Sequence, residues 1–130
     1  MLPFSVSIRT GRPLHDQIVF AVSKAIVIGQ LRPGDRFPSV RTLSQELEIN
    51  PNTAQRVVTT LVQRGLLETE AGIGTRVAAW RPAAFPGRRQ AIPETVAEHI
   101  ERLVVDAKQL GMDVSEVTDA IGREWKSETK

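Results

Sequence analysis

The 130-residue sequence predicts a mainly α (α+β) chain, in which helices and one β-hairpin form an N-terminal domain that precedes two C-terminal helices. Apolar residues recur at helical spacing over most of the chain. Two short strand-like runs interrupt this spacing after Gly65. Three prolines and three arginines within residues 80–93 are typical of a linker. We therefore expect a domain over residues 1–79, a linker over 80–92 and a helical tail over 93–130.

The first helix is predicted over residues 14–28. Pro13 lies where a helix start tolerates proline, and Gly29 lies where helices commonly end. Its apolar side consists of Leu14, Ile18, Val22, Ala25 and Ile26. A turn signal over residues 31–35, Leu-Arg-Pro-Gly-Asp, follows this helix.

Two further helices are predicted by their capping residues. Ser39 can cap a short helix over residues 40–47. Asn50 followed by Pro51 is a strong start signal for a helix that runs to about residue 64. The apolar stripe of that third helix consists of Ala54, Val57, Val58, Leu61 and Val62.

The remaining elements are a hairpin and the two tail helices. Residues 66–69 and 75–77 read as short strands that flank a loop. A tail helix is expected from Pro93 until Gly111 ends it, and Asp113 can cap a last helix. We expect residues 127–130 to fray.

This order of elements is that of a winged helix-turn-helix with a two-stranded wing. In such a domain the second helix of the pair lies in the DNA major groove, with its N-terminal residues nearest the base edges. Arginine and amide side chains can form paired hydrogen bonds to guanine and adenine. The third helix presents such residues opposite its apolar stripe, namely Asn52, Arg56, Thr59 and Gln63, flanked by Thr53 and Gln55.

The motifs of residues 2–78 resemble the GntR family of bacterial transcription factors in order and spacing. They are Pro13-Leu14-x-x-Gln17-Ile18, Gly29-x-Leu31-x-Pro33-Gly34-Asp35-x-x-Pro38-Ser39-x-Arg41-x-Leu43, Ile49-Asn50-Pro51-Asn52-Thr53, Leu61-x-x-x-Gly65-Leu66-Leu67 and Gly72-x-Gly74-Thr75-x-Val77. The Asn-Pro-Asn-Thr version with a two-helix tail resembles the short YtrA-like subfamily.

This resemblance implies a set of DNA contacts. The residues that match contacting positions are Arg41, Asn50, Asn52, Thr53, Gln55, Arg56 and, in the wing, Gly72, Gly74 and Arg76. Two departures from the family pattern weaken the expected electrostatic role of the wing tip in DNA binding. Ile73 stands where many relatives carry a basic residue, and Glu68 and Glu70 lead into the loop.

Several of these residues have a structural alternative. Arg41 could pair with an acid such as Glu46, and Asn50 is first of all a helix cap. The Gly72-x-Gly74 pair lacks the lysine of a phosphate-binding loop, so turn geometry explains it better. We expect His15 and His99 to be surface residues and Trp80 and Trp125 to be packing residues.

Other functional classes find little support. Without cysteine the chain has no disulfide, thiolate zinc site or cysteine nucleophile, and we see no catalytic set. We therefore predict no enzymatic activity, no cofactor and no metal. No apolar run reaches membrane-spanning length and the start lacks a secretory pattern, so a cytoplasmic location is expected.

The charge distribution suggests two roles. Residues 1–90 hold 12 Lys and Arg against 6 Asp and Glu, whereas residues 91–130 hold 5 against 9. A basic first part suits a polyanion. The acidic tail is too small to bury its apolar stripes alone, which favours a homodimer. The residues predicted at that dimer interface are Val96, Ile100, Leu103, Val104, Leu110, Val117, Ile121 and Trp125.

The sequence therefore predicts a homodimeric repressor that binds a palindromic operator in double-stranded DNA. The resemblance adds transporter genes as a plausible target. A small-molecule effector stays open, although the tail has no room for a large ligand domain. The alternative is a winged-helix module that binds protein rather than DNA, and a DNA mobility-shift assay distinguishes the two.

Overall fold

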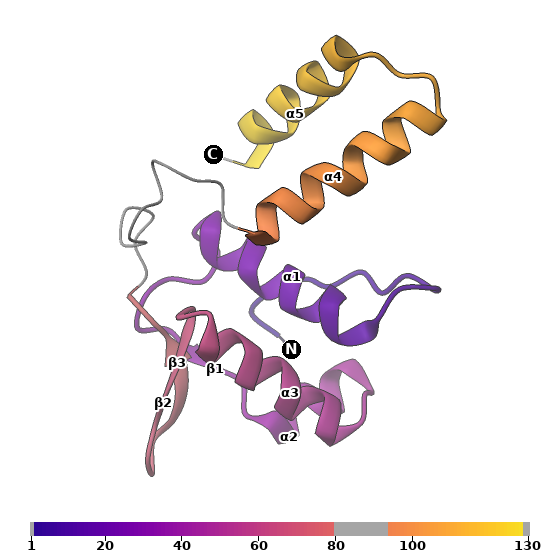
Figure 1. Cartoon of the computed structure of the whole chain (residues 1–130). Helices are drawn as coiled ribbons and strands as arrows, with labels where there is room; N and C mark the ends of the chain where they lie inside the picture. The colour runs from indigo at the N-terminus through magenta and orange to yellow at the C-terminus, as the bar shows by residue number, and fades with distance from the viewer. Residues whose placement is uncertain (1, 80–93, 129–130) are drawn as a thin grey trace. The chain divides into compact units, whose positions relative to one another are not determined.

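The computed structural model describes residues 2–79 and 94–128 (Figure 1). The chain divides into two compact units, residues 1–80 and 81–130, and each is described by itself. The predicted linker over residues 80–92 lies outside the described residues. The N-terminal unit contains α1 (Leu14–Val27), β1 (Arg36–Phe37), α2 (Val40–Leu47), α3 (Pro51–Gln63), β2 (Leu67–Glu70) and β3 (Gly74–Val77). The C-terminal unit contains α4 (Glu94–Gln109) and α5 (Val114–Glu128).

The predicted capping residues begin α2 and α3. The Ser39 hydroxyl accepts a hydrogen bond from the Thr42 backbone N–H at 3.1 Å. The Asn50 side-chain oxygen accepts one from the Asn52 N–H at 2.7 Å, and Pro51 occupies the first turn of α3. These side chains satisfy N–H groups that have no partner within the helix. The prediction of both helix starts is confirmed.

A left-handed residue makes the turn between α2 and α3. Glu48 has a φ of 55°, and its backbone N–H and that of Ile49 both donate to the Ser44 carbonyl. An L-residue in this conformation costs about 1–2 kcal/mol, because its Cβ approaches the following carbonyl. The turn therefore stores strain at the joint of the helix-turn-helix.

We expect Glu48→Gly to raise the free energy of unfolding by about 0.5–1 kcal/mol. Glycine removes the Cβ strain but adds about 0.5–1 kcal/mol of chain entropy to the unfolded state. Urea unfolding of both proteins measures the difference. Glu46→Gly, within α2, is the matched control and should lower stability by about 1 kcal/mol. Equal destabilisation by both changes would contradict the strain.

The sheet has a third strand that the sequence did not predict. Its order is β1-β3-β2, fully antiparallel, with Arg36 opposite Arg76 and Glu68 opposite Arg76 on the other side. The predicted two-stranded wing is confirmed as β2 and β3, and β1 adds a third strand to its sheet. A strand of two residues has no detectable alternation, and only pairing with β3 defines it. The hairpin of β2 and β3 extends away from the helices (Figure 1).

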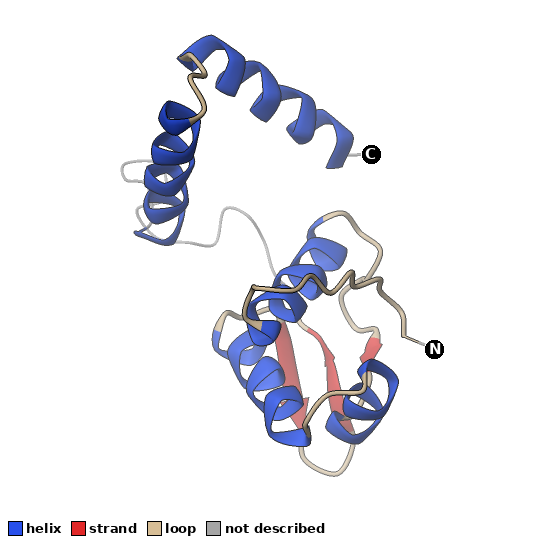
Figure 2. Ribbon diagram, turned by 90° about the vertical axis from the view of Figure 1, so that its right-hand side faces the viewer, coloured by secondary structure: helices blue, strands red, loops and turns tan. Residues whose placement is uncertain are grey.

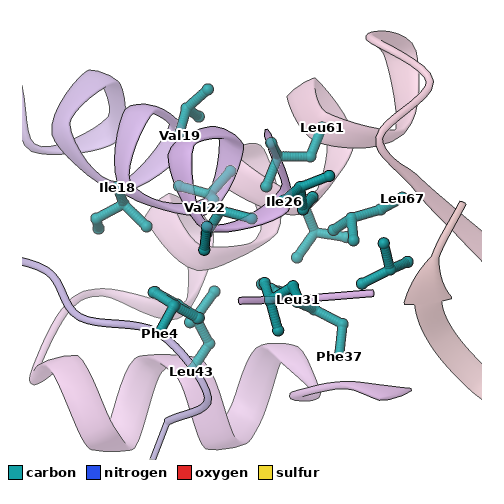
Figure 3. Close-up of a cluster of buried hydrophobic side chains, with 14 of the residues drawn as sticks. Phe4, Ile18, Val19, Val22, Ile26, Leu31, Phe37, Leu43, Leu61 and Leu67 are labelled. Carbon is teal, nitrogen blue, oxygen red and sulfur yellow. The ribbon is translucent and has the colours of Figure 1, made fainter. Parts of the chain in front are cut away.

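The core of the N-terminal unit lies between its three helices, its sheet and the segment that precedes α1 (Figure 2). Ile18 and Val22 of α1 and Leu61 of α3 are fully buried, as their helical spacing predicts. Phe4 reaches this core from residues 2–12, which we call the N-terminal arm. Its ring stacks on Phe37 with centroids 5.7 Å apart, and Figure 3 shows both among the buried side chains.

In the C-terminal unit, α4 and α5 meet at a turn in which Gly111 has a φ of 74°. Asp113 caps α5 as predicted: its carboxylate accepts from the Glu116 N–H at 2.9 Å, and Glu116 accepts from the Asp113 N–H at 3.2 Å. The sequence predicts fraying over residues 127–130; residues 127 and 128 belong to α5, and residues 129–130 lie outside the described residues.

The apolar side chains of this unit remain mostly uncovered. Ala107 is buried, whereas Leu103 is 39% and Trp125 is 72% exposed. Trp125, which the sequence predicts to pack and to lie at the dimer interface, is largely exposed within a single chain. The other exposed members of the predicted interface are Val96, Ile100, Val104, Leu110 and Ile121, and Val117 is half-buried.

Candidate nucleic-acid interface

The polar face of α3 is the first part of the candidate interface. Ala54, Val57, Val58 and Leu61 turn inward to the core, which fixes the rotation of the helix. That rotation leaves exposed side chains from the first three turns on the outer face, namely Asn52, Gln55, Arg56 and Thr59. No residue of α3 is acidic. Such a face offers donors and acceptors for base edges without repelling phosphates.

The other predicted contact residues in α2 and α3 differ in their exposure and in their hydrogen bonds. The Asn50 side-chain oxygen is engaged as a cap, as the structural alternative anticipated. Thr53 is half-buried. The Gln55 amide donates to the Thr59 hydroxyl at 3.3 Å, so these two side chains are linked along the outer face. Arg41 lies exposed in the first turn of α2, where the Ser44 hydroxyl donates to its backbone carbonyl at 2.9 Å.

In the wing, the Arg76 guanidinium lies between two carboxylates, an arrangement that we call the clamp. Arg76 Nε donates to Glu68 Oε1 at 2.8 Å, and its Nη1 lies 3.1 Å from Glu70 Oε2. The hydrogen bond to Glu68, with the charges of Glu70 and Glu68, raises the pKa of the Arg76 guanidinium above its ordinary value. Two carboxylates thus balance the cation that the sequence placed nearest to the wing tip. At that tip Gly72 and Gly74 have φ of 78° and 116°, which the turn requires.

A second wing cation was missed by sequence reasoning. Arg36 of β1 lies directly across from Arg76 in the sheet and is exposed. It lines a cavity of about 190 Å³ together with Ile73 and Gly74. The only sequence signal was a basic residue directly after the turn over residues 31–35, and it indicates a wing residue only once β1 is seen to pair with β3.

His15 is not the surface residue that the sequence predicts. Its side chain is 19% exposed, and its Nε2 lies 2.9 Å from the Thr60 hydroxyl and 3.4 Å from the Arg56 carbonyl. Its Nδ1 lies 3.1 Å from an Asp16 carboxylate oxygen. His15 therefore joins the first turn of α1 to the middle of α3. His99 is exposed, as expected, and Trp80 lies outside the described residues.

Two kinds of site find no support among the described residues. No group of three or more His, Asp or Glu side chains there could hold a metal ion. In the same part of the chain, no helix has the length and apolar character needed to cross a membrane.

Comparison with known proteins identifies the family. The model of the "Bacterial regulatory proteins, gntR family" matches residues 14–77. The HTH-type transcriptional repressor YtrA of Bacillus subtilis is 27% identical over 113 residues, which cover 87% of this chain and 85% of that protein. The uncharacterised regulator YhcF of the same organism is 29% identical over 117 residues, covering 87% and 90%.

Solved structures share the fold. A transcriptional antiterminator from Listeria monocytogenes superposes with a TM-score of 0.78 at 22% identity, covering 98% of this chain and 92% of that chain. The DNA-binding domain of AraR in complex with operator ORX1 superposes with a TM-score of 0.52 at 26% identity, covering 57% and 95%. The relatives that match nearly the whole chain are transcriptional regulators. By its winged helix-turn-helix and these matches, the chain belongs to the GntR family of bacterial regulatory proteins and is of the YtrA-like type.

Proposed function

We propose that the protein is a cytoplasmic, homodimeric repressor that binds a palindromic operator through α3, α2 and the wing. The observation that carries this proposal is the outer face of α3, which is polar, exposed and free of acidic side chains. A related domain, AraR(DBD), has been solved in complex with an operator, which supports double-stranded DNA as the partner.

Base readout is assigned to the first turns of the two helices. In a helix-turn-helix these residues come closest to base edges, whereas later residues contact the backbone. Asn52 can pair with adenine and Arg56 or Arg41 with guanine. Asn50 contributes chiefly by capping α3, because its side-chain oxygen already accepts the Asn52 N–H.

The dimer is assigned to the exposed apolar stripe of α4 and α5. An apolar stripe of this extent on two helices requires a partner surface. Two copies related by a two-fold axis would present two α3 helices to two half-sites, which is why we propose a palindromic operator. Repression needs no activating surface, because an occupied operator excludes polymerase.

A mobility-shift assay followed by selection of bound duplexes tests this function. Selection should yield a sequence with two inverted half-sites about one helical turn apart or a multiple of that spacing. Transporter genes are the first targets to examine, following the resemblance to YtrA-like regulators. Failure to retain any duplex over random DNA would favour a protein-binding module instead.

Binding should weaken steeply as salt rises. Each phosphate that a Lys or Arg neutralises releases counterions, so the logarithm of the binding constant falls by about 0.9 per contact for each tenfold rise in salt. Fluorescence anisotropy with random duplexes at several salt concentrations measures the slope. A slope near zero would exclude DNA as a polyanionic partner.

The wing should act through Arg36 rather than Arg76. Arg76 is balanced by two carboxylates, whereas Arg36 lies beside it on β1. We expect Arg36→Gln to weaken binding to random duplexes and to lower the salt slope by about 1, as for one lost phosphate contact. Arg76→Gln is the matched control and should change the slope less. The opposite ranking would show that the clamp opens on DNA.

A further inference from the structure

A cavity between the N-terminal arm and α1 lies apart from the elements assigned to DNA. Its volume is about 530 Å³, which falls within the usual range of small-molecule sites. The arm runs alongside α1 in both views of the chain (Figures 1 and 2). Arm residues form one wall, and Gln17, Phe20, Ala21 and Lys24 of α1 form the other.

The arm is fixed at both ends of this cavity. Phe4 anchors one end in the core by stacking on Phe37. Gln17 anchors the other end: its Oε1 accepts from the Arg9 N–H at 2.6 Å, and its Nε2 donates to the carbonyls of Arg9 and Arg12 at 3.0 and 3.1 Å. All three bonds use backbone atoms of the arginines. The guanidinium groups of Arg9 and Arg12 therefore take no part in these hydrogen bonds to Gln17.

The lining combines positive charge with an aromatic surface. Arg9, Arg12 and Lys24 are cationic, and none of the nine described residues that line the cavity is acidic. Phe20 presents a ring that is 67% exposed. Guanidinium groups bind phosphate and carboxylate oxygens in pairs, and an exposed ring offers a planar apolar contact. Cationic side chains beside an exposed aromatic ring are together complementary to an organic anion.

The cavity is on the face of α1 that points away from α3. His15 contacts Thr60 of α3, and Lys24 follows it by nine positions, two and a half turns of helix. Their side chains thus leave α1 in opposite directions. This face of α1 is therefore separate from the outer face of α3 that is assigned to DNA.

We propose that this cavity binds a small organic anion, in which a phosphate or carboxylate group is joined to a planar apolar body. Arg9 and Arg12 hold the anionic group and Phe20 packs on the apolar body. The site lies within the N-terminal unit and goes beyond the DNA-binding function, on which it does not depend.

Amide NMR spectra of the full chain, titrated with phenyl phosphate, test the site directly. We expect saturable shifts confined to residues 5–24, weaker binding of inorganic phosphate and none of benzyl alcohol. Arg9→Gln/Arg12→Gln should weaken phenyl phosphate at least tenfold. Phe20→Ala should weaken phenyl phosphate several-fold and leave inorganic phosphate unchanged. Arg64→Gln, an exposed cation at the end of α3, is the matched control and should bind normally.

Three results would overturn the proposal. One is the absence of saturable shifts in the wild-type chain. Another is an equal loss in the Arg64→Gln variant, which would indicate non-specific charge. The third is a parallel loss of DNA binding, which would make the DNA backbone the source of the phosphate. We expect Arg9→Gln/Arg12→Gln to retain affinity for random duplex DNA within about twofold. If its DNA affinity falls as far as its phenyl phosphate affinity, the arginines serve the DNA backbone instead. Thermal unfolding of each variant checks that the arm remains in place.

Discussion

Leu103→Glu is expected to dissociate the proposed dimer while the N-terminal unit stays folded. Leu103 lies in the apolar stripe of α4, and a carboxylate placed there would be buried without a partner at a cost of about 3–5 kcal/mol. The described residues of the core around Ile18 and Leu61 all belong to the N-terminal unit, so its unfolding should not change. Sedimentation should give the mass of one chain.

The same variant should lose its preference for a palindrome. Two linked domains gain about 10²–10⁴-fold in affinity from simultaneous contact, and separate chains do not. Binding to a single half-site should be preserved. Arg102→Gln is the matched control, because it lowers the net charge by the same amount outside the predicted apolar stripe. A dimer of normal size in the Leu103→Glu variant would show that the tail covers its stripe in another way.

The helices could be predicted because their signals are local. The Ser39 and Asn50 caps and Pro51 fix where α2 and α3 begin, and the apolar spacing of each helix fixes its buried face. These features also place Asn52 and Arg56 on the outer face, so the main part of the candidate interface was accessible from sequence.

What the sequence did not reveal depends on residues that are distant along the chain. The bond between His15 and Thr60 spans 45 positions. Glu68 was recognised as a weakness of the wing, but only the register of β2 against β3 sets it opposite Arg76. β1 is too short to have a period of its own, and Arg36 became visible as a wing residue only through that strand.

The exposed stripe of α4 and α5 marks a different limit. Periodicity predicts which face of a helix is apolar, and both helices follow that prediction. It does not say what covers the face, because the covering surface can belong to another molecule. Trp125 illustrates this point: an aromatic at a helical apolar position predicts packing, yet the ring is 72% exposed. For such residues the assembly must be measured.

Asn52→Ala and Arg41→Ala are each expected to weaken binding to the selected operator by about 1–3 kcal/mol, the value of a good base contact. Both changes spare the scaffold. The Asn50 cap uses the backbone N–H of residue 52, and the Ser44 hydroxyl bonds to the backbone carbonyl of residue 41. Affinity for random duplexes should fall much less, because counterion release dominates it. Anisotropy titrations with both duplexes at one salt concentration give the ratio.

The control for this prediction is Gln63→Ala, at the far end of the same helix. Gln63 is exposed on α3 but lies in its last turn, beyond the residues that approach base edges in a helix-turn-helix. Its removal should leave the ratio between operator and random duplex nearly unchanged. If Asn52→Ala and Arg41→Ala weaken both duplexes equally, these side chains are phosphate contacts. Specificity would then have to come from Gln55 and Arg56, or from the deformability of the operator itself.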